Sequence, residues 1–98
     1  MTERGSAALD RLDPVTVRPI TSEDRAASHV LEATRRARGM PKAELARRAG
    51  LQLRTLHYYL DCERAMTVGT FRALCDALGL SREDAAAAIT RWLSRPVL

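Results

Sequence analysis

The sequence predicts an all-α fold, with five helices in one small domain that follows an irregular N-terminal arm. Its 98 residues suit a single hydrophobic core. Apolar residues make up 46% of the chain and aromatic residues only 4%, so the core must consist largely of Ala and Leu, which favour helices. From about residue 22 onward, apolar residues recur at spacings of three and four. We expect an arm over residues 1–21, a main helical domain over 22–80, and a C-terminal helix and tail over 81–98.

The arm shows no helical period, and Pro14 and Pro19 each remove a backbone donor. Two interpretations remain open. The arm is a flexible tail, or Val15 and Val17 belong to a short strand that pairs with another edge or with a partner subunit.

The first helix is predicted over about residues 23–38. Thr21 or Ser22 can cap its N-terminus, and Asp24 stands at the capping-box spacing from Thr21. Gly39 supplies the left-handed residue that ends it. Its apolar stripe consists of Ala27, Val30, Leu31 and Thr34.

Two short helices follow, over about residues 42–49 and 52–60. Pro41 suits the start of the first, and Gly50 separates the pair. The apolar positions of the first are Ala43, Leu45, Ala46 and Ala49, and those of the second are Leu53, Leu56, Tyr59 and Leu60.

The last two helices are also marked by caps. Thr67 opens one that ends at Gly79, and Ser81, with Asp84 three residues later, opens another that runs to about Ser94. The first of these has the apolar positions Val68, Phe71, Leu74, Cys75 and Leu78. The second is expected to bury a stripe of Ala85, Ala88, Ile89 and Trp92.

Composition argues against several classes of function. No apolar run is long enough to span a bilayer, and the N-terminus lacks the pattern of a signal peptide, so we expect a cytoplasmic protein. Cys62 and Cys75 lack metal-site spacing, and His29 and His57 lie on separate helices without clustered carboxylates. We therefore expect no metal, cofactor, small-molecule ligand or enzymatic activity.

The positive charge of the chain lies in its middle. Residues 31–64 contain eight Lys and Arg against four Asp and Glu, and the rest of the chain is balanced. Such a segment fits a polyanionic partner and equally fits a solvated helix face.

The two short helices have the spacing of a helix-turn-helix. A small residue at position 46 lets the next helix cross closely, Gly50 adopts the turn conformation, and large apolar residues anchor the second helix. The opposite face of that helix is left free to enter a DNA major groove. The packing residues are Leu45, Ala46, Gly50, Leu51, Leu56 and Tyr59.

From about residue 29 to 80 the chain resembles the Cro/repressor-type (XRE-like) helix-turn-helix family. The resemblance is carried by GMPKAELARRAGLQLRTLHYYLDCERAMTVGTFRALCDALGL, in which Leu45, Ala46, Gly50, Thr55, Leu56, Leu74, Leu78 and Gly79 are all in register. It implies a small repressor or Cro-like regulator of a bacterium or its phage, associated with the nucleoid. Its partner would be double-stranded DNA with a two-fold operator, bound by a homodimer. The alternative is a protein-interaction module, such as an antitoxin or an anti-repressor partner.

The resemblance also implies the contact residues. The groove-facing set, expected to contact bases, is Gln52, Leu53, Arg54, Thr55, His57 and Tyr58. Phosphate contacts are expected from Lys42, Arg47 and Arg64.

The chain departs from the family pattern at several positions. The family often has a Glu near the end of the recognition helix that pairs with an Arg of the first helix, but Leu60 stands opposite Arg35 here. Arg35 is therefore expected to find Asp61, Glu63, water or phosphate. Cys62 stands where Gly is frequent, and Pro41 stands where Ser or Thr usually caps.

The C-terminal helix offers more apolar surface than a four-helix core needs. Ile89, Trp92 and Leu93 are therefore a candidate dimer contact. Alternatively, Trp92 packs on the first helix within one subunit.

Overall fold

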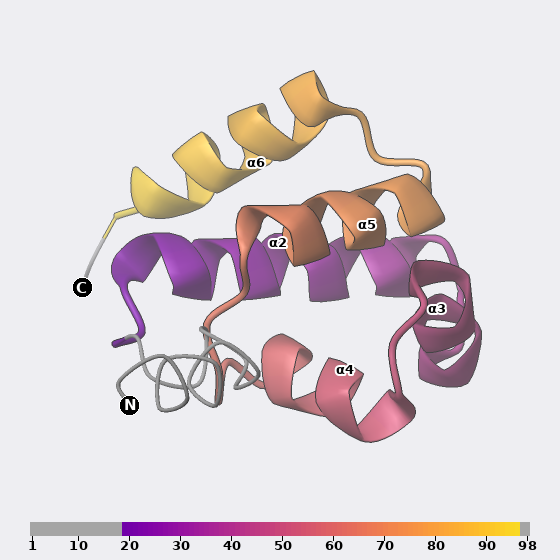
Figure 1. The fold of residues 1–98 in the computed structure, drawn as a ribbon. Helices are drawn as coiled ribbons and strands as arrows, with labels where there is room; N and C mark the ends of the chain where they lie inside the picture. The colour runs from indigo at the N-terminus through magenta and orange to yellow at the C-terminus, as the bar shows by residue number, and fades with distance from the viewer. Residues whose placement is uncertain (1–18, 97–98) are drawn as a thin grey trace, which may run out of the picture.

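A computed structural model describes residues 19–96, and within them it confirms the all-α fold with five helices (Figure 1). The arm, including Val15 and Val17, lies outside the described residues except at its last few positions. The helices are α2 (Ser22–Ala37), α3 (Lys42–Ala49), α4 (Leu53–Leu60), α5 (Val68–Leu78) and α6 (Arg82–Leu93).

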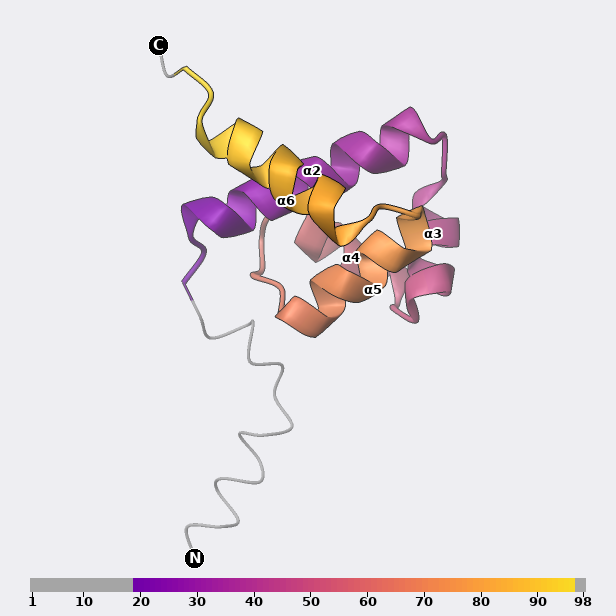
Figure 2. The ribbon, with the colours of Figure 1, turned by 90° about the horizontal axis from the view of Figure 1, so that it is seen from above.

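The helices are arranged around α2 and α5, which pack against each other. In Figure 1, α6 lies above this pair and α4 lies below it, while α3 stands at one end. The view from above in Figure 2 shows α6 crossing over α2. The last helix and the second helix of the predicted helix-turn-helix therefore occupy opposite sides of the domain.

Side-chain caps fix the beginnings of three helices. The Thr21 hydroxyl accepts from the Asp24 N–H at 3.2 Å, and the Asp24 carboxylate accepts from the Thr21 N–H at 2.8 Å. This reciprocal box identifies Thr21, and not Ser22, as the cap of α2. Thr67 and Ser81 cap α5 and α6 in the predicted way, each accepting from the backbone N–H three residues on.

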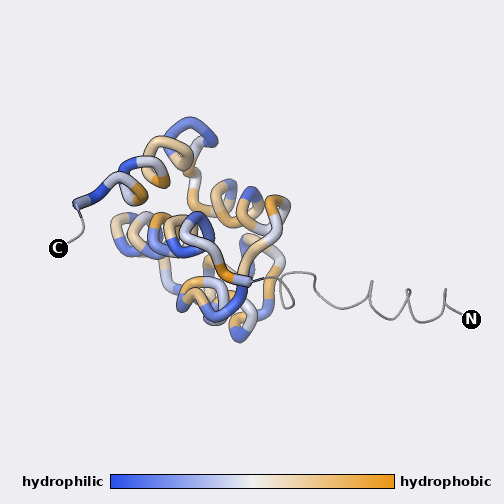
Figure 3. Tube along the Cα trace, turned by 90° about the vertical axis from the view of Figure 1, so that its left-hand side faces the viewer, coloured by the Kyte–Doolittle hydropathy of each residue, from blue (hydrophilic) through white to orange (hydrophobic). Residues whose placement is uncertain are grey.

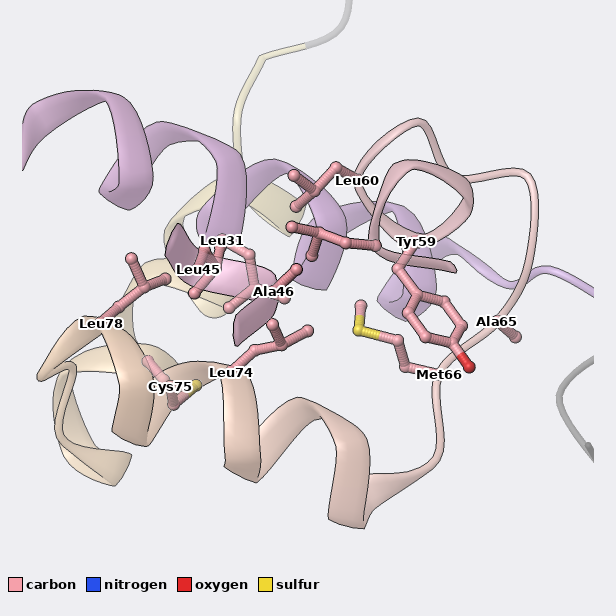
Figure 4. Packing of buried hydrophobic residues seen from close by; sticks show 12 residues of the cluster. Leu31, Leu45, Ala46, Tyr59, Leu60, Ala65, Met66, Leu74, Cys75 and Leu78 are labelled. Atoms are coloured by element: carbon pink, nitrogen blue, oxygen red, sulfur yellow. The ribbon is translucent and has the colours of Figure 1, made fainter. Parts of the chain in front are cut away.

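The core is formed by apolar faces that all five helices turn inward. Figure 3 shows apolar and polar residues alternating along each helix, which is the pattern of amphipathic helices around one core. The largest fully buried side chains are Leu31, Leu45, Leu56 and Leu74, one from each of α2 to α5. Figure 4 shows the surrounding cluster, in which Met66 and Tyr59 approach each other beside Leu74.

The prediction that α6 buries a stripe of four residues was wrong about how deeply the stripe is buried. Among its residues only Ala85 is buried, while Ala88, Ile89 and Trp92 are half-buried. The reason is that α6 lies on the outer side of α2 and α5, so that no further helix of the described chain covers its flanks. The helical period predicted which residues face inward, but not how deeply they are covered.

Candidate DNA-binding surface

A sharp turn of three residues joins α3 to α4. Gly50 ends α3 with φ +74° and ψ +28°, a left-handed conformation that costs a side-chain-bearing residue about 1 to 2 kcal/mol. The next N–H, that of Leu51, donates to the Ala46 carbonyl at 2.8 Å and closes the end of α3. Ala46 itself is only 3% exposed, and Leu51 packs on the core from its rim. The chain thus turns where the sequence places its glycine.

Helix α4 is held to the domain by one side. Leu56, Tyr59 and Leu60 are buried, and α4 packs on both α2 and α3. In addition, the buried Ser28 hydroxyl of α2 donates to the Tyr59 carbonyl at 2.6 Å, in the last turn of α4 where carbonyls lack helical partners. Sequence reasoning missed Ser28. The only signal was a small polar residue beside the apolar stripe of α2.

The other side of α4 faces outward and carries the predicted base-contact residues. Gln52, Arg54 and Leu53 are exposed at its N-terminal end, with Leu53 42% exposed. Thr55 and His57 are half-buried on its flanks. Gln52 is the N-cap residue, but its side chain makes no capping hydrogen bond. This set of side chains suits contact with base edges, because Gln and Arg can hydrogen-bond to bases and an apolar side chain can meet a thymine methyl group.

Tyr58 and Arg64 form a single unit at the other end of α4. The Arg64 guanidinium carbon lies 4.0 Å from the centre of the Tyr58 ring, within the range of a cation–π contact. Both side chains are half-buried. The family resemblance assigned Tyr58 to base contact and Arg64 to phosphate contact, and no feature of the sequence predicted that the two side chains touch.

The predicted phosphate contacts of α3 differ in their surroundings. Lys42 is the first residue of the helix and is half-buried, whereas Arg47 is exposed in the last turn. Arg48, beside it, is paired with Glu44 at 2.6 Å, so its charge is partly neutralised. Arg47 and Lys42 are the α3 cations with no such pair among residues 19–96.

Arg35 does not find the partners expected from the sequence. Its guanidinium pairs with Glu32 on the same helix at 2.8 Å and also donates to the Met40 carbonyl at 2.8 Å. It thereby ties the end of α2 to the chain that leads into α3. Because Glu32 accepts hydrogen bonds from Arg35 and, more weakly, from Arg36, its pKa is lowered to about 2. Glu32 lies three residues from Arg35 on the same helix face, so it takes the place of Asp61 and Glu63 as the ion-pair partner of Arg35.

Trp92 of α6 packs within the chain. Its ring centre lies 5.7 Å from that of His29 on α2, and the Arg95 guanidinium carbon lies 3.4 Å from the centre of the indole ring. Leu93, its neighbour, is 39% exposed. Trp92 is only half-buried, so part of its ring stays accessible, and its contact with a second copy of the chain stays a prediction.

Within residues 19–96, no three His, Cys, Asp or Glu side chains gather in a way that would hold a metal ion. The described helices also include none with the length and apolar character that crossing a membrane requires. Cys75 is buried, and burial together with the nearby Asp76 charge raises the pKa of its thiol to about 11.

Fold and surface together define a helix-turn-helix domain, with one helix anchored on the core and its outer face free. The family comparison agrees, because a model described as a helix-turn-helix domain matches residues 26–88. The chain belongs to this helix-turn-helix family, which is consistent with the XRE-like resemblance of its sequence. Comparison with curated proteins and with solved structures finds no match in either set.

Proposed function

We propose that the protein is a sequence-specific transcriptional regulator, a small repressor or Cro-like protein of a bacterium or its phage, and that α4 enters the major groove of DNA. The observation that carries this proposal is the outer face of α4. Leu56 and Tyr59 bury one side of this helix in the core, and its other side presents Gln52, Leu53 and Arg54 to solvent. The helix belongs to a domain of the helix-turn-helix family.

The chemistry of these side chains suits base recognition. Arg54 can donate two hydrogen bonds to guanine, Gln52 can pair with adenine, and Leu53 can contact a thymine methyl group. Thr55 and His57, on the flanks, are proposed to contact the edges of the site. Lys42 and Arg47 of α3 are proposed to bind backbone phosphates beside the groove, which fixes the orientation of α4.

We further propose that the protein binds a two-fold operator as a homodimer. A single helix-turn-helix buries too little surface for high specificity, and two copies reading successive major grooves would stand about 34 to 36 Å apart. On α6, Leu93 is exposed and Ile89 is half-buried, which leaves apolar surface for a symmetric contact.

Binding-site selection from a random duplex library with the purified chain tests this function. The expected result is a two-fold consensus whose half-sites are separated by about one helical turn. The proposal fails if selection enriches no sequence and the chain binds no duplex even at low salt, where phosphate contacts are strongest.

One observation favours a second candidate, a protein-interaction module. A groove of about 510 Å³ lies between α5 and α6, and its lining includes Val68, which is 76% exposed, together with the half-buried Phe71 and Ile89. Exposed apolar surface of this kind often marks a protein contact. Salt-dependent binding to a selected duplex would favour the regulator, and its absence would favour the module.

A further inference from the structure

We infer that Tyr58 is a positioning residue for Arg64, and that the two act together as one preformed clamp on a DNA phosphate. This inference rests on the proposed function. It assigns Tyr58 a role other than reading a base, because the guanidinium covers one face of its ring.

The backbone brings the two side chains together. After α4 ends, the loop folds back on its last turn. The Asp61 N–H donates to the His57 carbonyl at 2.9 Å, and the Glu63 N–H donates to the Tyr58 carbonyl at 2.8 Å. Immediately after Arg64, Ala65 and Met66 are buried in the core. The backbone at Arg64 is therefore fixed on both sides, six residues from Tyr58.

The ring then fixes the side chain. A guanidinium over an aromatic ring gains a cation–π contact, and the N–H groups at its edge remain able to donate to phosphate oxygens. Among residues 19–96 Arg64 forms no ion pair, although Asp61 and Glu63 lie in the same loop. The positive charge of Arg64 is thus held at the end of α4 and is not neutralised by an ion pair with the neighbouring acidic residues.

Holding Arg64 before DNA arrives has a thermodynamic consequence. A free arginine side chain loses rotamer freedom when it is ordered at an interface, and prior ordering reduces that loss. Removing the ring should therefore weaken a phosphate contact that Tyr58 itself does not make. The charge of the chain stays unchanged when Tyr58 is replaced, so a change in salt dependence would report on Arg64.

The experiment is a double-mutant cycle on binding to a selected duplex, measured by fluorescence anisotropy over a series of salt concentrations. The variants are Tyr58→Ala, Arg64→Ala, the double variant, and Tyr58→Phe, which keeps the ring and removes only the hydroxyl. Circular dichroism confirms that each variant is folded. If Tyr58→Ala does not fold, Tyr58→Leu replaces it, because Leu keeps apolar bulk without an aromatic face.

We expect Tyr58→Ala to weaken binding about two- to fivefold and to make the salt dependence shallower, toward that of Arg64→Ala, whose slope falls by about one. The double variant should bind no more weakly than Arg64→Ala alone, and Tyr58→Phe should retain the wild-type affinity and slope.

Three results would overturn the inference alone: losses that simply add, an unchanged salt slope in Tyr58→Ala, or a Tyr58→Phe variant as weak as Tyr58→Ala. The last result would instead assign the Tyr58 hydroxyl to a direct contact. A wild-type chain that binds no duplex would overturn the proposed function and this inference with it.

Discussion

At the scale of single residues, Cys62 departs most clearly from what its position favours. It follows α4 with φ +59°, and within residues 19–96 every other positive φ belongs to a glycine. Its N–H donates to the Tyr59 carbonyl at 3.1 Å, so the turn depends on this conformation. The resemblance had placed a frequent Gly here, and the structure gives the physical reason.

Replacing Cys62 with Gly should therefore stabilise the domain. A left-handed conformation costs a non-glycine residue about 1 to 2 kcal/mol, and the greater unfolded-state entropy of Gly offsets about 0.5 to 1 kcal/mol of that. We expect Cys62→Gly to raise the free energy of unfolding by about 0.5 to 1 kcal/mol in urea denaturation. Cys62→Ala is the matched control, because it keeps the Cβ atom and should give no such gain. A Gly variant less stable than the Ala variant would contradict this account of the turn.

Glu32 makes stability depend on pH. Its pKa is lowered from 4.5 to about 2 in the folded chain, chiefly by the hydrogen bond from Arg35. The stabilisation from this group is therefore complete above about pH 5 and is lost as the pH falls toward 2. The difference in melting temperature between the wild type and Glu32→Gln should shrink over that interval. Glu23→Gln, a change at an exposed position on the same helix, serves as the control. If the difference in melting temperature between the wild type and Glu32→Gln stays constant down to pH 2, the stabilising role of the Glu32–Arg35 pair is contradicted.

At the scale of elements, the sequence predicted the helices and their order well, because caps and glycines act locally. Thr21, Thr67 and Ser81 begin helices where their side chains predict, and Gly39, Gly50 and Gly79 follow helix ends with positive φ. The depth of burial on α6 could not be predicted, since it depends on how α6 lies across α2 and α5. The Tyr58–Arg64 contact and the Ser28 hydrogen bond were missed for the same reason, because each joins segments whose spacing only the folded chain defines.

The attachment of α6 to α2 depends on Trp92. Its indole ring packs beside His29 and under Arg95, so truncation removes half-buried aromatic area. We expect Trp92→Ala to lower the free energy of unfolding by about 2 kcal/mol, less than the 3 to 5 kcal/mol typical of fully buried aromatics. Chemical denaturation measures the loss, and sedimentation follows the oligomeric state.

Leu93→Ala is the control for stability, since Leu93 is exposed on the same turn of α6. For dimerisation it is a second test, because Leu93 belongs to the proposed contact. A folded Trp92→Ala chain of unchanged stability that has lost dimerisation would show that Trp92 acts at an interface and not within the subunit. If Leu93→Ala alone disrupts the dimer, the proposed contact lies on the exposed face of α6.

At the scale of the whole molecule, the arrangement separates two surfaces. The outer face of α4 lies on one side of the α2 and α5 pair, and α6 lies on the other (Figure 1). A contact between two copies through α6 would therefore leave both α4 helices uncovered. A two-fold contact directly opposite α4 would, however, point the two α4 helices in opposite directions, so a dimer that presents both helices to one DNA duplex needs its contact on a flank of α6 and not on the side that faces away from α4.

The central claim is that α4 reads DNA sequence, and Arg54 tests it most directly. It is exposed on the outer face of α4, so its replacement should leave the fold intact. The measurement is the affinity of Arg54→Ala for the selected duplex and for a scrambled one. The control is Arg91→Ala, an equal change of charge at an exposed position on α6.

We expect Arg54→Ala to lose about 1 to 3 kcal/mol of binding free energy on the selected duplex, to lose much less on the scrambled one, and to relax preference at one base pair. Arg91→Ala should lose little on either. Equal losses of Arg54→Ala on both duplexes would move Arg54 to the phosphate backbone, and no loss on either would contradict the claim that the outer face of α4 enters the groove.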